Sequence, residues 1–77
     1  MNIQRRSILD KAIRLLTEAQ EIITTAADDE RDYFDAMPYN LQETERGSNA
    51  EEAADNLYPI EDELVDMIDV ITEAKGE

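Results

Sequence analysis

The side chains that come closest to forming a chemical site in this sequence are carboxylates. The 77 residues include 20 aspartates and glutamates, but no cysteine and no histidine. Without those two residue types the chain cannot build a cysteine- or histidine-based nucleophile–base pair, or the usual ligand sets of zinc, haem and iron–sulfur clusters. We therefore expect a protein that is not an enzyme and that holds no cofactor and no metal ion.

One group of carboxylates has a spacing that could bind magnesium. Its members lie about three residues apart in both halves of the chain: Glu18, Glu21, Glu63, Asp66 and Asp69. This spacing resembles the magnesium sites of all-α nucleotide pyrophosphohydrolases, so a magnesium-dependent nucleotide hydrolase is one alternative function. The helical pattern described below turns most of these side chains outward, whereas a metal site needs ligands that converge. A solvated helix surface is the interpretation we favour.

A second acidic cluster, at residues 28–32, lacks the spacing and the central glycine of an EF-hand loop. Its member Glu30 falls in an otherwise apolar row. We expect Glu30 to form an ion pair, either with Arg46 or with Arg31 of a second copy of the chain.

Two further groups of residues are candidates for binding a partner. The C-terminal half carries outward-facing acids at regular spacing, and a row of this kind can occupy a basic groove that normally binds phosphates, although it can also serve solubility alone. The middle of the chain mixes an aromatic ring with polar groups, a composition typical of contact surfaces, although end-capping explains it equally well. The predicted partner-binding residues are Tyr39, Asn40, Gln42, Arg46, Asp55, Asp62, Asp66 and Asp69.

Apolar residues at alternating spacings of three and four predict two long helices that position these groups. The first helix is predicted at about residues 4–37, with this row: Leu9, Ala12, Leu16, Ala19, Ile23, Ala26, Tyr33 and Met37. Pro38 ends it, because the residue before a proline avoids the α conformation. A loop at 38–48 follows, in which Tyr39 and Leu41 are expected to fold back and plug the end of the molecule.

The second helix is predicted at about residues 49–75, with Ser48 as N-cap and Glu51 completing a capping box. Its row reads as a heptad seam: Ala50, Ala53, Leu57, Ile60, Leu64, Met67, Ile71 and Ala74. Pro59 removes one backbone hydrogen bond, so we predict a kink near it, with a split into two helices as the alternative. Gly76 is the predicted C-cap.

These elements predict an all-α fold, a single domain over residues 1–77 that forms an antiparallel two-helix hairpin. The hairpin brings the start of the chain, with a net charge of +2 over residues 1–20, beside residues 48–77, with a net charge of −9. The first helix has more apolar surface than one neighbour covers. We predict that this surface forms the interface of a homodimer, a four-helix bundle, through Ile8, Ile13, Leu15 and Ile22. A helix of another protein is the alternative occupant.

The net charge of −13 disfavours direct binding of nucleic acid and favours a partner with a basic surface. No apolar run approaches the length of a membrane span or of a signal-peptide core, so we expect no membrane interaction and a cytoplasmic location.

About half of the chain resembles a group of small acidic proteins from phages and mobile elements, which are mostly of unknown function. The run that carries the resemblance is Asp35-x-Met37-Pro38-x-Asn40-Leu41-Gln42-x-x-Glu45-Arg46-Gly47, followed by Glu51-Glu52-Ala53-x-Asp55-x-Leu57. The resemblance implies a helical hairpin and transfers no catalytic residue; Pro59 departs from it. It implies a phage-type protein that binds and modulates or inhibits a protein of the host cell, as anti-CRISPR and anti-restriction proteins do. The alternative is a DNA mimic that inhibits a nucleic-acid-binding enzyme.

Overall fold

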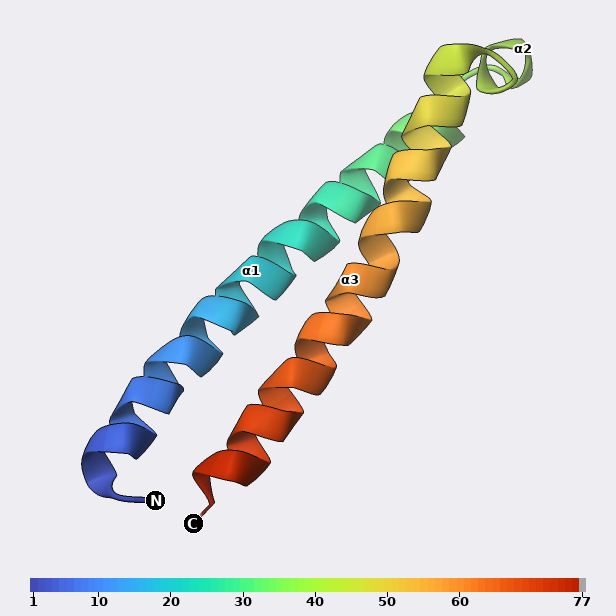
Figure 1. The fold of residues 1–77 in the computed structure, drawn as a ribbon. Helices are drawn as coiled ribbons and strands as arrows, with labels where there is room; N and C mark the ends of the chain where they lie inside the picture. The colour runs from blue at the N-terminus through green and yellow to red at the C-terminus, as the bar shows by residue number, and fades with distance from the viewer. Residues whose placement is uncertain (77) are drawn as a thin grey trace.

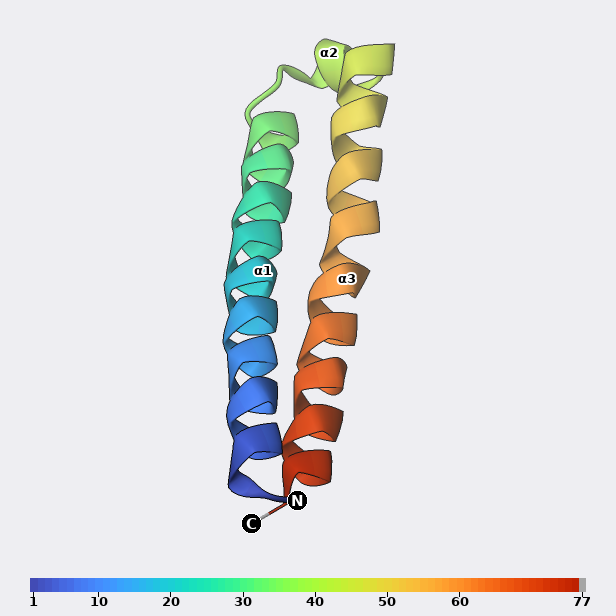
Figure 2. The same cartoon turned by 60° about the vertical axis from the view of Figure 1, so that its left-hand side comes forward.

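Two long antiparallel helices, joined by one short helix, make up the molecule (Figure 1). The computed structural model describes residues 1–76 and contains α1 (Ile3–Asp35), α2 (Tyr39–Gln42) and α3 (Glu45–Lys75). Both views place the start of α1 and the end of α3 together at one end of the rod and α2 at the other (Figures 1 and 2). The rod measures 58 × 14 × 14 Å. The predicted all-α hairpin is confirmed.

The first helix is capped at both ends by local groups. The side chain of Asn2 accepts a hydrogen bond of 2.8 Å from the backbone N–H of Arg5, which satisfies one of the free donors of the first turn. The helix ends at Asp35 rather than near Met37, with Ala36 as C-cap. Pro38 thus stops the helix somewhat earlier than predicted.

The connection differs from the predicted loop at 38–48. Four of its residues form α2, and the last helix begins at Glu45, inside the predicted loop. Its N-cap is Thr44, whose hydroxyl accepts a hydrogen bond from the backbone N–H of Gly47. The predicted N-cap, Ser48, is therefore wrong: this residue already lies within the first turns of α3.

The last helix runs without a break through Pro59, so the alternative of two separate helices is wrong. Pro59 is exposed, which lets water reach the backbone carbonyl that its ring deprives of a donor. In both views α3 curves gently along its length (Figures 1 and 2). Gly76 is the C-cap, as predicted, with a positive φ of 67°.

The contact between α1 and α3 is lined by small residues at one end and larger ones at the other. The buried residues are all small: Ala27 on α1, and Gly47, Ala50 and Ala54 on α3. No large side chain among residues 1–76 is fully buried. The hairpin by itself therefore encloses very little core.

The seam on α3 lies one column away from the predicted one. Four predicted residues do face α1, since all are buried or half-buried: Ala50, Leu57, Leu64 and Ile71. Of the other four, Ala53 is half-buried, whereas Ala74 is exposed and Ile60 and Met67 are 36% and 52% exposed on the flank. Their places in the seam are taken by Ala54, Glu61, Ile68 and Lys75, which are buried or half-buried. On α1 the same shift exposes Tyr33 and brings Phe34 inward.

The hairpin consequently has two unlike faces. On the face we call polar, side chains link the helices through Asp10 and Lys75, Gln20 and Glu61, and Asp28 and Tyr58. The opposite face, which we call apolar, carries Ile8, Leu15, Ile22 and Tyr33 from α1 and Ile60, Met67 and Val70 from α3, all at least 36% exposed. Two hollows on this face also have charged residues in their walls. One is lined by Tyr33, Ala53, Glu30, Glu45 and Arg46, and the other by Leu16, Met67, Val70, Glu63 and Asp66.

None of the helices in the described part of the chain is both long enough and apolar enough to cross a membrane.

Candidate functional site

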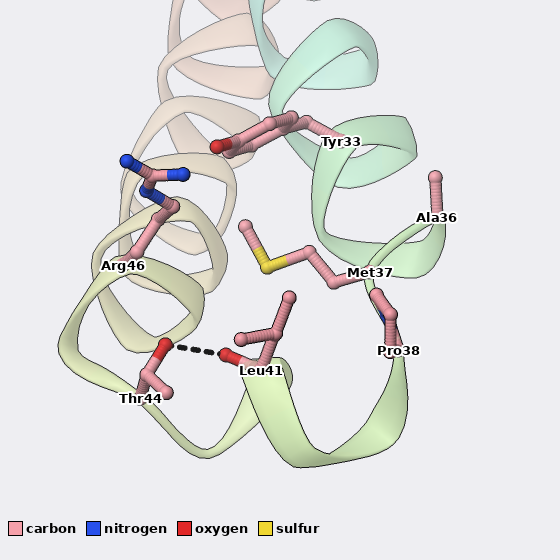
Figure 3. A pocket seen from close by; sticks show the side chains of 7 residues that line it. All are labelled: Tyr33, Ala36, Met37, Pro38, Leu41, Thr44 and Arg46. Carbon is pink, nitrogen blue, oxygen red and sulfur yellow. Dashed lines mark hydrogen bonds between the residues drawn. The ribbon is translucent and has the colours of Figure 1, made fainter.

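A pocket of about 360 Å³ lies at the end of the rod where the three helices meet. It is lined by Tyr33, Ala36, Met37, Pro38, Leu41, Thr44 and Arg46. Figure 3 shows the side chains of Met37 and Leu41 approaching each other in its centre, with Tyr33 and Arg46 along one edge. The predicted plug is thus partly formed by Leu41, whereas Tyr39 is 77% exposed and takes no part in it.

Gln42 has a structural role within this connection. Its side-chain amide donates hydrogen bonds of 3.1 Å to the carbonyl of Phe34 and 3.3 Å to that of Met37. These carbonyls lie at and just beyond the end of α1, where the regular helical hydrogen bonds stop, and that of Phe34 also accepts a hydrogen bond of 3.1 Å from the backbone N–H of Met37. The residue predicted to contact a partner therefore holds α2 against the end of α1, and its half-buried position fits this role.

Gly47 completes the same junction from α3. A Cβ atom at this position would lie 2.7 Å from both the Cα and the carbonyl carbon of Gln42, closer than real Cβ contacts allow. Only a glycine permits α2 and the first turn of α3 to approach so closely. The sequence places Gly47 only within the predicted loop at 38–48, because nothing in it shows which backbone approaches this residue.

Tyr39, Asn40 and Arg46 are exposed around this junction, and their side chains remain free to contact a partner. Arg46 and Glu30 line a shared hollow, but within residues 1–76 they form no ion pair. Of the two alternative ion pairs predicted for Glu30, the one with Arg46 is therefore not formed. Arg31 forms an ion pair with Asp35, with 3.4 Å between Nε and Oδ1. Its guanidinium group also lies over the ring of Phe34, 5.5 Å from the ring centre.

The four predicted partner-binding acids of α3 are all exposed along its outer side: Asp55, Asp62, Asp66 and Asp69. No lysine or arginine occurs between Arg46 and Lys75, so this side carries negative charge without local neutralisation. Among residues 1–76, no three acidic side chains are close enough together to hold a metal ion. The spacing that resembled a magnesium site therefore does not bring its carboxylates together.

The residues predicted to form a dimer interface fall in two places. Ile8, Leu15 and Ile22 are 68%, 56% and 65% exposed on the apolar face. Ile13 is half-buried and shares its helical column with the buried Ala27, which faces α3. Ile13 thus belongs to the hairpin's own seam and not to the exposed strip.

The polar face holds an interaction that sequence reasoning did not predict. The hydroxyl of Tyr58 donates a hydrogen bond of 2.9 Å to the carboxylate of Asp28. This hydrogen bond, followed by partial loss of water, raises the pKa of Tyr58 above its ordinary value of 10.0. The two residues lie 30 positions apart, so only the hairpin register brings them together.

Comparison with known proteins gives no relative for this arrangement. No protein-family model matches the chain, and no curated protein and no solved structure is significantly similar to it.

Proposed function

We propose that this chain is a non-enzymatic phage-type protein that acts as a homodimer in the cytoplasm of a host cell. It binds a host protein with a basic surface and modulates or inhibits that protein. The observation that carries the proposal is the unneutralised acidic outer side of α3. Between Asp55 and Asp69 this side is rigidly helical and spans about 21 Å, a length comparable to a protein contact patch.

Two other features support a binding role. Tyr39 projects from the end of the same rod with 77% of its surface exposed, and an exposed tyrosine is a common anchor at interfaces. The resemblance of residues 35–57 to small acidic phage proteins adds a biological setting, in which the host partner belongs to a defence system.

The proposal is tested by capturing the tagged full-length chain from a host lysate and identifying the bound protein. We then expect the triple variant Asp55→Asn, Asp62→Asn and Asp69→Asn to lose that protein. The matched control neutralises three exposed acids of α1 instead, by Glu18→Gln, Glu21→Gln and Asp32→Asn, and should retain it. Equal retention by both variants would overturn the role of α3.

A more specific alternative is mimicry of DNA, which the spacing of the acids favours. Six acidic residues lie in two neighbouring helical columns along the outer side of α3. One column contains Glu52, Asp66 and Glu73, and the other contains Asp55, Asp62 and Asp69. Apart from the gap at Pro59, a carboxylate occurs every three or four residues, which is about 5 Å along the axis, compared with about 3.4 Å between the phosphates of one DNA strand. In this case the chain should compete with DNA for the captured protein, and the binding should weaken steeply with salt. A captured protein that binds no nucleic acid would exclude mimicry.

A further inference from the structure

We infer that the apolar face of α1 binds α1 of a second copy in one antiparallel register, centred on Thr17. This inference rests on the proposed homodimer and adds the contacts that define it. It makes the second copy, rather than an unrelated helix, the occupant of the exposed strip.

The exposed apolar strip of α1, which contains Ile8, Leu15 and Ile22, lies where a second neighbouring helix contacts a helix in a bundle. The residues of α1 that face α3 lie in the two helical columns that contain Ala27 and Leu16. The strip lies about a quarter-turn further around the helix and consists of two adjacent columns. A helix in a four-helix bundle contacts its two neighbours at roughly this angle. α1 is therefore shaped as the corner of a bundle with α3 as only one of its neighbours.

The two columns differ in size in a way that matches a copy running in the opposite direction. One column is large, with Ile8, Leu15 and Ile22, and the other is small, with Ala12, Ala19 and Ala26. Thr17 lies midway between Ile8 and Ala26, between Leu15 and Ala19, and between Ala12 and Ile22. A two-fold axis at the level of Thr17 therefore places every large side chain opposite an alanine, the arrangement that fills an interface without gaps or overlap.

The charges at the ends of the strip agree with the same centre. Arg5 continues the small column and Asp29 continues the large one, and Thr17 is again midway between them. Both side chains are exposed, and neither makes an ion pair with another residue in the range 1–76. The inferred register brings Arg5 of each copy next to Asp29 of the other, so that each dimer contains this pair twice.

The apolar residues of α3 lie across the same level. The contacts of Asp10 with Lys75, of Gln20 with Glu61 and of Asp28 with Tyr58 align the two helices and place Thr17 level with a residue between about 64 and 69 of α3. Ile60 lies on one side of that level and Val70 on the other. One two-fold axis at the level of Thr17 therefore brings the apolar residues of α3 in the two copies toward one another.

The size of the face and the placement of charge allow such a dimer. The 58 Å and 14 Å extents give one face of the rod a footprint of about 800 Å², the area that each partner contributes to a typical stable interface. Asp62 and Asp69 lie on the outer side of α3, whereas Glu63 and Asp66 line the hollow of Met67 and Val70. The two copies thus meet mainly through apolar residues, with these two acids beside the contact.

Disulfide trapping tests the register, because the chain has no cysteine of its own. Two single variants, Ile8→Cys and Ala26→Cys, are oxidised separately and as a mixture, and the products are weighed by mass spectrometry. We expect a covalent heterodimer in the mixture and little covalent dimer from either variant alone. In the inferred register the two copies of residue 8 lie about 27 Å apart, far beyond the reach of a disulfide. In the negative control, Glu18→Cys, which lies on the outer side of α1, takes the place of Ala26→Cys in the mixture.

A charge swap gives an independent measurement. Arg5→Glu removes this exposed ion pair twice in each dimer and should weaken dimerisation about two- to thirtyfold, and adding Asp29→Arg should restore it. Loss of affinity in both the single and the double variant would contradict the contact.

The outcomes separate this inference from the function on which it rests. Ready self-crosslinking of Ile8→Cys, or a wild-type dimer that gives no heterodimer crosslink, overturns the register and leaves the dimer standing. A wild-type chain that sediments as a monomer at tens of micromolar overturns both the register and the dimer. In that case the capture experiment still decides whether α3 binds a host protein.

Discussion

At the scale of single residues, the junction between the helices depends on Gly47 and Gln42 together. The amide of Gln42 satisfies two carbonyls near the end of α1, and the missing side chain of Gly47 leaves room for the backbone of Gln42. Folding alone explains the roles of both residues at the junction, without a ligand or a partner.

We predict that Gly47→Ala destabilises the hairpin by about 1–3 kcal/mol, the usual cost of forcing an extra carbon into a filled site. The new Cβ would meet backbone atoms of Gln42, which cannot move aside as a flexible side chain would. Urea unfolding followed by circular dichroism, at one fixed protein concentration, measures the loss. The exposed neighbour Asn49 gives the control, Asn49→Ala, which should change stability little. Equal stability of Gly47→Ala and the wild type would show that α2 does not lie against α3.

Tyr58 gives the protein a pH-dependent contribution to stability. The folded chain holds the phenol proton more tightly than the unfolded chain, because the hydrogen bond to Asp28 raises the pKa of Tyr58. The stabilisation is therefore complete below pH 10 and is lost as the pH rises through the folded-state pKa. We predict that Tyr58→Phe lowers the free energy of unfolding at pH 8 and that the difference from wild type shrinks by pH 11. A difference that stays constant over this range would contradict the hydrogen bond.

At the scale of the elements, the start of α3 shows how a local sequence signal can mislead. Ser48 followed by Glu51 fits the capping-box pattern, yet Thr44 caps the helix four residues earlier. Thr44 is favoured because Gly47 then lies in the first turn, where it can contact α2. The tertiary contact decides between two acceptable caps, and the sequence contains no record of that contact.

We predict that Thr44→Ala costs about 1 kcal/mol of stability, whereas Ser48→Ala costs little. The reason is that the Thr44 hydroxyl both accepts from the backbone of Gly47 and donates to the carbonyl of Leu41. Thermal unfolding of the two variants side by side makes the comparison. The opposite order would restore Ser48 as the cap and move the start of the helix.

The helices themselves were predictable, whereas the side that each turns toward the other was only partly so. The spacing of apolar residues gave two helices and a hairpin, and Pro38 gave the end of the first. The seam was misplaced by one column on α3 because both helices are apolar over more surface than a single neighbour covers. Where the apolar surface is this wide, the two helices approach each other most closely at small residues such as Ala27 and Ala54. Hydrophobicity alone does not identify these residues.

At the scale of the whole molecule, the same excess of apolar surface connects the fold to the proposed assembly. A hairpin whose fully buried side chains are all alanines has little stability of its own, and a chain of this size without disulfides commonly gains stability by association. The polar face needs no cover, since side-chain contacts already bridge its two helices. Among residues 1–76 the apolar face has no such contact, and we propose it as the surface for a second copy.

The two surfaces should respond to salt in opposite ways, and this is the prediction that separates them. Two copies with a net charge of −13 each repel one another, so raising NaCl from about 0.05 to 0.5 M should tighten the dimer by screening that repulsion. The same change should weaken binding of a basic partner to α3, because there the charges attract. Sedimentation at several salt concentrations measures the first effect, and capture at the same concentrations measures the second. A dimer that dissociates as salt rises would place its main contacts among charged residues, and the apolar face would then not be the interface.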